Sequence, residues 1–249
     1  MSGHSKWHNI KLRKGKQDAE RGKAFTKLAK EIIVAAREGG GNPDANMRLR
    51  MSIQKARDSS MPADNIKRAI QRGTGEIEGV IYDEISYEGY GPGGVAVMVT
   101  CLTDNRNRTV ADVRSYFSKC GGNLGETGSV SWMFDSRGVI EIPKGGVEED
   151  SVMMATMDAG AEDIRTEDDT IEVTTSPEAL QAVRQALTDA GIKFTMAEVT
   201  MLPKNTVTVD AKVASQVLRL VDMLEEHDDV QQVYSNVDIP DDILEALES

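Results

Sequence analysis

The spacing of apolar residues in this 249-residue chain is purely helical up to about residue 75 and includes strand-like segments beyond it, and this change limits the folds open to the chain. Before residue 75, apolar side chains recur every three or four residues, which is the period of an α-helix. Beyond it, several short segments alternate apolar and polar residues, which is the period of a β-strand. The sequence therefore predicts a multidomain α+β protein that begins with a helical domain.

Three helices are expected in this first domain, residues 1–78. The apolar residues from Phe25 to Ala36 follow a helical stripe, and the glycine run 39–41 ends it. Pro62 and Gly73 have the positions that favour the start and the end of a third helix. Between these two, the second helix is expected to bury a stripe of Leu49, Ile53 and Ala56.

The rest of the chain is predicted to form two α/β domains. Residues 137–203 follow the order strand, helix, strand, strand, helix, strand, which is the ferredoxin-like order. The elements before this segment are too few to close a sheet without those after it. We therefore expect residues 79–136 and 204–249 to form one discontinuous α/β domain, with the ferredoxin-like domain inserted into it. The strands expected around the insertion lie at 84–90, 95–103, 130–134 and 230–237.

Charge is divided unevenly between these parts. Residues 1–78 hold 17 basic and 9 acidic side chains, whereas residues 79–249 hold 12 basic and 32 acidic ones. A cationic segment next to an acidic remainder is typical of a nucleic-acid-binding arm. At physiological salt the Debye length is about 8 Å, so the acidic part does not cancel a local cationic patch. The alternative is a basic helix face that only contacts solvent.

The residues expected to contact nucleic acid in this first domain are mostly cations of the N-terminal arm and of the first helix. Trp7 has two interpretations, because it can stack on a base or pack the arm against the helical domain. The predicted contacts here are Lys6, Trp7, Lys11, Arg13, Lys14, Lys16, Arg21, Lys23 and Lys27.

A second candidate contact lies in the segment 103–109, inside the acidic part of the chain. Arg106 and Arg108 stand with two asparagines in a loop that leads into a predicted helix. Such a loop suits the binding of a phosphate or of a polar RNA edge. The equally weighted alternative is an asparagine that caps the helix while the arginines pair with nearby carboxylates.

The sequence favours neither catalysis nor a cofactor. The glycines of 89–94 lie between two strands, whereas a phosphate cradle requires a strand followed by a helix, so a hairpin is the better interpretation. His4 and His8 could share a helix face, but no cysteine or acidic ligand lies close to them in sequence, so a metal site is not favoured. Cys101 and Cys120 are interpreted as reduced thiols. We expect no catalytic residue, no metal and no cofactor. The expected central strands of the ferredoxin-like segment, 139–142 and 170–174, contain no aromatic residue on which RNA bases could stack, but a small-ligand role stays open.

No run of about 18 apolar residues exists, so no membrane partner is expected. The basic N-terminal segment has no apolar stretch behind it and does not resemble a secretory signal. These features predict a cytoplasmic protein.

Five blocks of sequence resemble the YebC family, which includes the mitochondrial translational activator of cytochrome oxidase. They are GHSKW at 3–7, the segment 39–46, YEGYGPGG at 87–94, DNRNRT at 104–109 and SKCGGNLG at 118–125. The resemblance extends over essentially the whole chain. It implies a cytoplasmic protein of three domains, helical first and α/β thereafter, with a non-enzymatic role in gene expression.

The resemblance leaves the nucleic acid open. Members are described as transcriptional regulators that bind DNA, and others resemble translation factors that act at the ribosome. Our main hypothesis is a DNA-binding transcription regulator, with the transcription machinery as a further partner. The alternative is a ribosome-associated translation factor that binds ribosomal or messenger RNA. A third hypothesis is a small-ligand sensor built on residues 137–203.

Overall fold

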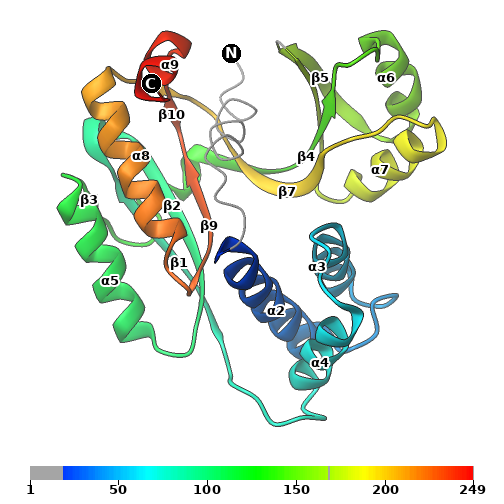
Figure 1. Cartoon of the computed structure of the whole chain (residues 1–249), viewed down its shortest axis with the longest axis horizontal. Coiled ribbons are helices and arrows are strands. Elements are labelled where there is room, and N and C mark those ends of the chain that lie inside the picture. Colours follow the sequence, from blue (N-terminus) through cyan, green and yellow to red (C-terminus); the bar gives the residue numbers. More distant parts are fainter. Residues whose placement is uncertain (1–18, 168, 249) are drawn as a thin grey trace. The chain divides into compact units, whose positions relative to one another are not determined.

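The computed structural model describes residues 19–167 and 169–248 (Figure 1). These residues form two compact units. One contains residues 19–130, 209–235 and 239–248, and the other contains residues 131–208 and 236–238.

The first unit begins with three helices, as predicted. They are α2 (Ala19–Gly39), α3 (Met47–Asp58) and α4 (Ala63–Gly73). The buried Asn46 fixes the turn between α2 and α3, because its side chain caps α3 by accepting from Leu49 N at 3.0 Å. Its amide nitrogen donates to the carbonyls of Ala35 and Gly40, so one side chain satisfies backbone groups at the end of one helix and the start of the next.

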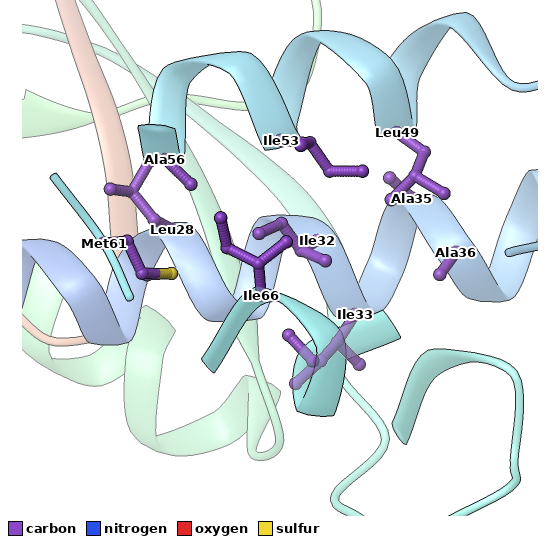
Figure 2. Packing of buried hydrophobic residues seen from close by; sticks show 11 residues of the cluster. Leu28, Ile32, Ile33, Ala35, Ala36, Leu49, Ile53, Ala56, Met61 and Ile66 are labelled. Carbon is purple, nitrogen blue, oxygen red and sulfur yellow. The ribbon is translucent and has the colours of Figure 1, made fainter. Parts of the chain in front are cut away.

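These helices enclose a small apolar core (Figure 2). Burial of one such leucine or isoleucine contributes about 1.5–3 kcal/mol, so this core holds the helical domain together. The predicted stripe of α3 is confirmed, and Ile66 of α4 is also buried, whereas Ile70 is only partly covered. The core is made by Leu28, Ile32, Ile33, Ala35, Ala36, Leu49, Ile53, Ala56, Met61, Ile66 and Ala69.

The end of α4 lies very close to α2. A Cβ on Gly73 would stand 2.5 Å from the carbonyl oxygen of Ile33 and 2.7 Å from the Cβ of Ala36. Gly73 therefore sets the distance between the two helices, because no other residue fits there without a shift of backbone.

The rest of the first unit is an antiparallel sheet with helices packed on it. The strands β1 (Asp83–Tyr90), β2 (Ala96–Thr103), β3 (Asn123–Leu124) and β9 (Val230–Ser235) are paired in the order β3-β1-β2-β9. Helices α5 (Arg106–Lys119) and α8 (Ala211–Glu225) contact this sheet and each other (Figure 1). The C-terminal helix α9 (Asp241–Glu248) packs next to α8. Elements far apart in sequence thus share one core, which includes Val113, Phe117, Val217, Leu220 and Leu224.

The second unit contains the predicted order of elements. It consists of β4 (Phe134–Pro143), α6 (Glu149–Thr156), β5 (Ala161–Glu167), β6 (Thr170–Thr175), α7 (Leu180–Asp189) and β7 (Met196–Pro203). A short 3-10 helix, η3 (Met157–Ala159), extends α6. The strands pair in the order β5-β6-β4-β7, all antiparallel. A separate parallel pair joins β8 (Val207–Thr208) to β10 (Val237–Asp238).

The coarse fold prediction is therefore confirmed: a helical N-terminal domain is followed by an α+β region with two main antiparallel sheets. The strand expected at 130–134 is wrong, because Ser131–Met133 is a 3-10 helix, η2, and β4 begins at Phe134. The carboxylate of Glu88 explains the difference. It accepts hydrogen bonds from the backbone N–H groups of Gly128 and Val130, both at 2.8 Å, and so takes the donor of the first residue of the expected strand.

The close approach at Gly73 leads to a test of the helical packing. We expect Gly73→Ala to lower the free energy of unfolding by about 1–3 kcal/mol, since the added methyl group meets backbone. The matched control is Gly22→Ala in α2, where an added Cβ meets no described atom within 4 Å. This control should leave stability unchanged or raise it by about 0.5–1 kcal/mol, because alanine favours the helix. Urea denaturation measures both, and equal midpoints would contradict the packing account.

Candidate nucleic-acid interface

The predicted contacts of the N-terminal arm lie outside the described residues. This applies to Lys6, Trp7, Lys11, Arg13, Lys14 and Lys16. Arg21 belongs to α2, but its side chain is also outside the description. These seven residues remain predictions.

A row of lysines on α2 contacts the C-terminal end of α8 and the turn that follows it. Residues three or four apart on a helix lie on one face, so the row projects from one side of α2. The last carbonyls of a helix lack intrahelical partners and form its negative pole, which favours cations there. The three amino groups donate to three backbone carbonyls: Lys23 to Glu226 at 3.3 Å, Lys27 to Glu225 at 2.7 Å, and Lys30 to Asp228 at 3.0 Å.

The row ends in a buried ion pair. Lys30 Nζ lies 2.9 Å from an oxygen of Asp229, and both side chains are almost fully buried. The same ammonium lies over the ring of Tyr82, 5.2 Å from its centre, and donates to the carbonyl of Leu102 at 3.4 Å. Lys30, which the sequence places among the basic residues of the first 30 positions, therefore serves to join the helical domain to the sheet.

Asp229 receives hydrogen bonds from several directions at once. Its second carboxylate oxygen accepts from Arg108 at 2.7 Å, from Thr109 at 2.9 Å and from Thr103 at 3.0 Å. Burial acts to raise the pKa of Asp229, but the hydrogen bonds from Arg108, Lys30 and Thr109 outweigh it and hold the pKa well below its usual range. The carboxylate is thus ionised throughout the neutral range and links α2, β2, α5 and the start of β9.

The geometry of the segment 103–109 is that of a capped helix whose arginines pair with carboxylates, which is one of its two interpretations. Asn105 caps α5 by accepting from Arg108 N at 3.1 Å. Arg108 pairs with Asp104 at 2.8 Å as well as with Asp229, and Arg106 pairs with Asp83 at 2.9 Å. Both guanidinium groups have carboxylate partners, although both side chains stay exposed. A phosphate contact at this loop therefore remains a prediction and would have to compete with these ion pairs.

A set of exposed cations on α3 and α4 was not among the predicted contacts. Within residues 19–167 and 169–248, none of these side chains has an ion-pair partner. Arg48 differs from them, since it pairs with Glu31, Glu38 and Glu84 at 2.8–3.0 Å. The apolar stripes of the second and third helices are the sequence signal for this set, because they place the charged residues on the side of each helix away from the core. We name Arg50, Arg57, Lys67, Arg68 and Arg72 the exposed cation set.

The sheet of the second unit contains two buried carboxyl groups on neighbouring strands. Glu141 and Glu172 are opposite each other on β4 and β6, and both side chains are buried. Burial raises the pKa of Glu141 to about 8, and the charges of Glu172 and Glu198 add to the rise. With so raised a pKa, Glu141 is largely protonated at neutral pH, and neither of these buried groups offers a cation to a phosphate.

The cysteine and histidine side chains that could serve catalysis or bind a metal have surroundings that fit a role in the fold. Burial raises the pKa of the Cys101 thiol to about 12, and the neighbouring Asp229 adds to the effect, so the reactive thiolate is disfavoured. His227 accepts from the backbone N–H of Asp229 and its other ring nitrogen lies 3.2 Å from Asp112. Among the described residues, no group of three or more His, Cys, Asp or Glu side chains is placed to hold a metal ion. The glycine-rich segment joins two strands as predicted: residues 89 and 90 end β1, and residues 91–95 form the turn that leads into β2.

Comparison with known proteins identifies the family. The model of the TACO1/YebC protein N-terminal domain matches residues 5–76, and that of the TACO1/YebC second and third domain matches residues 82–237. The chain belongs to the TACO1/YebC family.

Relatives in the TACO1/YebC family are similar over their whole length. A protein of Dictyoglomus turgidum named "Probable transcriptional regulatory protein" is 57% identical over 99% of this chain and 100% of its own. A protein of Desulfotalea psychrophila with the same descriptive name is 58% identical over 99% of each chain. The crystal structure of a conserved hypothetical protein from Aquifex aeolicus is 48% identical, with a TM-score of 0.81 over 91% of this chain and 94% of that one. Among the described residues, no helix has the length and apolar character needed to cross a membrane.

The buried carboxylate of this TACO1/YebC protein gives a test of the contact between the helices and the sheet. We expect Asp229→Asn to lower the free energy of unfolding by about 3–5 kcal/mol, because Lys30 stays buried without an anionic partner. The matched control, Asp83→Asn, removes only the exposed pair with Arg106 and should cost about 0–1 kcal/mol. Urea denaturation at neutral pH separates the two, and equal losses would contradict the role of Asp229.

The acid dependence of stability should change in the same variant. The folded pKa of Asp229 is depressed, so its ionised form stabilises the fold above the unfolded pKa of about 3.9, and this contribution is lost as pH falls towards the folded pKa. We expect the wild-type chain to lose more stability than Asp229→Asn between neutral pH and about pH 3. Parallel acid profiles for the two chains would show that Asp229 is not the depressed group.

Proposed function

We propose that this protein is a non-enzymatic regulator of gene expression that binds nucleic acid through its cationic helical domain. The observation that carries the proposal is the exposed cation set on α3 and α4, whose five side chains have no carboxylate partner among the described residues. Cations without a carboxylate partner are available to phosphates, because nothing has to be displaced before they bind. The names of the relatives, which describe transcriptional regulatory proteins, support the same class of function.

The predicted arm and the exposed cation set belong to the same domain, and we propose that they act together. The arm supplies Lys6, Trp7, Lys11, Arg13, Lys14, Lys16 and Arg21 as proposed contacts. Lys23 and Lys27 already donate to carbonyls at the end of α8, so we expect a smaller contribution from them. Arg106 and Arg108 are proposed as a secondary site, since each would have to share its guanidinium group with a carboxylate.

The chemistry of these contacts favours binding to the phosphate backbone over sequence readout. Lysine and arginine on helix surfaces bind phosphates of DNA and RNA alike, and base recognition needs side chains aimed at base edges. We propose DNA as the target, in keeping with the names of the relatives, and thus a cytoplasmic transcription regulator. Ribosomal or messenger RNA is the alternative target, because a backbone-dominated interface fits it equally well in physical terms.

We also propose the division of the chain into domains 1–78, 79–136 with 204–249, and an inserted ferredoxin-like domain 137–203. The sheet order β5-β6-β4-β7 with two helices supports the ferredoxin-like assignment of the last. The pairing of β2 with β9 supports a discontinuous domain, because these strands come from opposite sides of the insertion. In this arrangement the cationic domain stands at one end of the sequence and the acidic α/β domains follow it.

Salt dependence of binding tests the proposal. We expect the dissociation constant of the full chain for a mixed-sequence duplex to rise steeply with salt, with a log–log slope that falls by about 0.9 for each phosphate contact removed, or about 0.7 on single-stranded RNA. Two triple variants should flatten the slope. The first changes α3 and α4 and carries Arg50→Ala, Arg57→Ala and Arg68→Ala. The second changes the arm and carries Lys11→Ala, Arg13→Ala and Lys14→Ala. Fluorescence anisotropy with labelled DNA and RNA measures both targets.

A matched control removes cations elsewhere. Lys144→Ala with Lys193→Ala takes exposed lysines from the second unit and should leave the slope unchanged. Equal slopes for all these chains, or no binding by the wild-type chain in dilute buffer, would contradict the proposal. Stronger binding to RNA than to DNA would select the translation alternative.

A further inference from the structure

Three methionines lie exposed together on α6 and η3 of the second unit. Met153, Met154 and Met157 have 38%, 84% and 67% of their surface accessible. Residues three and four apart are neighbours on a helix surface, so Met157 adjoins both of the others. The buried Val152 and Thr156 turn the opposite side of α6 towards the sheet. The three side chains, which we name the methionine face, therefore form one continuous apolar area.

Exposure of a continuous apolar area to water is unfavourable in free energy, so such an area favours binding to an apolar partner. Exposed apolar residues scattered singly are ordinary, whereas a continuous patch marks an interaction surface. Methionine is unbranched and polarisable, so a surface made of it adapts to the shape of an apolar partner. The other large apolar side chains of α6 and α7, namely Val152, Leu180, Val183 and Leu187, are buried.

The charges around the methionine face restrict the partner. Residues 148–160 contain Glu148, Glu149, Asp150 and Asp158 and neither lysine nor arginine. Glu148, Asp150 and Asp158 are exposed. Nucleic acids and anionic membranes would both be repelled by these carboxylates, and a cationic partner would be attracted. The partner must then combine apolar side chains with lysine or arginine.

We propose that the methionine face docks an amphipathic, basic helix of another protein. The apolar side of that helix would cover the methionines, and its lysines or arginines would lie near Glu148, Asp150 and Asp158. This arrangement is the general one in which an amphipathic helix lays its apolar face on a hydrophobic surface. The proposal goes beyond the binding of nucleic acid, because it rests on the second unit and on none of the cations of the helical domain.

The experiment uses the full chain and three synthetic peptides of about 18 residues, a length that spans five helical turns. The first is an amphipathic helix of leucine and lysine. The second has glutamate in place of each lysine, and the third has the first composition in an order without an apolar face. We expect the first peptide to bind in calorimetry, and the other two to bind at least about tenfold more weakly.

Variants locate the binding on the chain. Met154→Gln with Met157→Gln should weaken the first peptide about tenfold, whereas Met47→Gln, which changes a half-exposed methionine of the helical domain, should leave binding unchanged. Asp150→Asn with Asp158→Asn should weaken binding about threefold and reduce its dependence on salt. Circular dichroism shows whether each variant keeps its fold, which is expected because all the changed side chains are exposed.

Four outcomes would overturn the proposal. They are no binding of the first peptide, equal binding of the third, unchanged binding by the double methionine variant, and binding of vesicles of anionic lipid at the same face. Because the peptide assay contains no nucleic acid, its failure would leave the function proposed for the helical domain untouched.

Discussion

The ion pair between Lys30 and Asp229 is the interaction on which the arrangement of the first unit depends. It joins α2 to the segment that leads into β9, and it places two opposite charges almost out of contact with water. Arg108 and two threonines complete the bonding of the same carboxylate. Burial of charges is tolerated only when such partners are present. The helical domain is thereby held against the sheet by one side, and the exposed cation set stays in contact with water.

The helices could be predicted from sequence because their signal is local. The stripe of Leu49, Ile53 and Ala56 and the glycine at 73 are visible within a few turns of chain. The centre at Asp229 could not be predicted, because Lys30 and Asp229 are 199 positions apart and neither stands in a motif. Local spacing also could not decide between a phosphate site and a capped helix at 103–109, since one of the two partners of Arg108, Asp229, comes from a distant part of the chain. The strand expected at 130–134 was wrong for a similar reason, because the distant Glu88 binds the N–H group of its first residue, Val130.

The number of lysines and arginines in the helical domain therefore overstates the positive charge that is available to a nucleic acid. Three lysines of α2 bind carbonyls at the end of α8 and in the turn after it, and so they stabilise the fold. The five members of the exposed cation set on α3 and α4 have no carboxylate partner among the described residues, which shifts the proposed interface along the domain. The methionine face adds a second surface of different chemistry, apolar and anionic, on the other unit. The two proposed surfaces thus suit different partners, a polyanion for the helical domain and a basic helix for the second unit.

Chemical labelling of lysine amino groups tests this account most directly. In the free protein, Lys27 and Lys30 should react slowly with an acylating reagent, because their amino groups are bound to carbonyls and to Asp229, whereas Lys67 should react quickly. Addition of duplex DNA or RNA should protect Lys67 and leave the slow rates of the other two unchanged. Fast labelling of Lys30 in the folded protein, or protection confined to Lys27 and Lys30, would contradict the account.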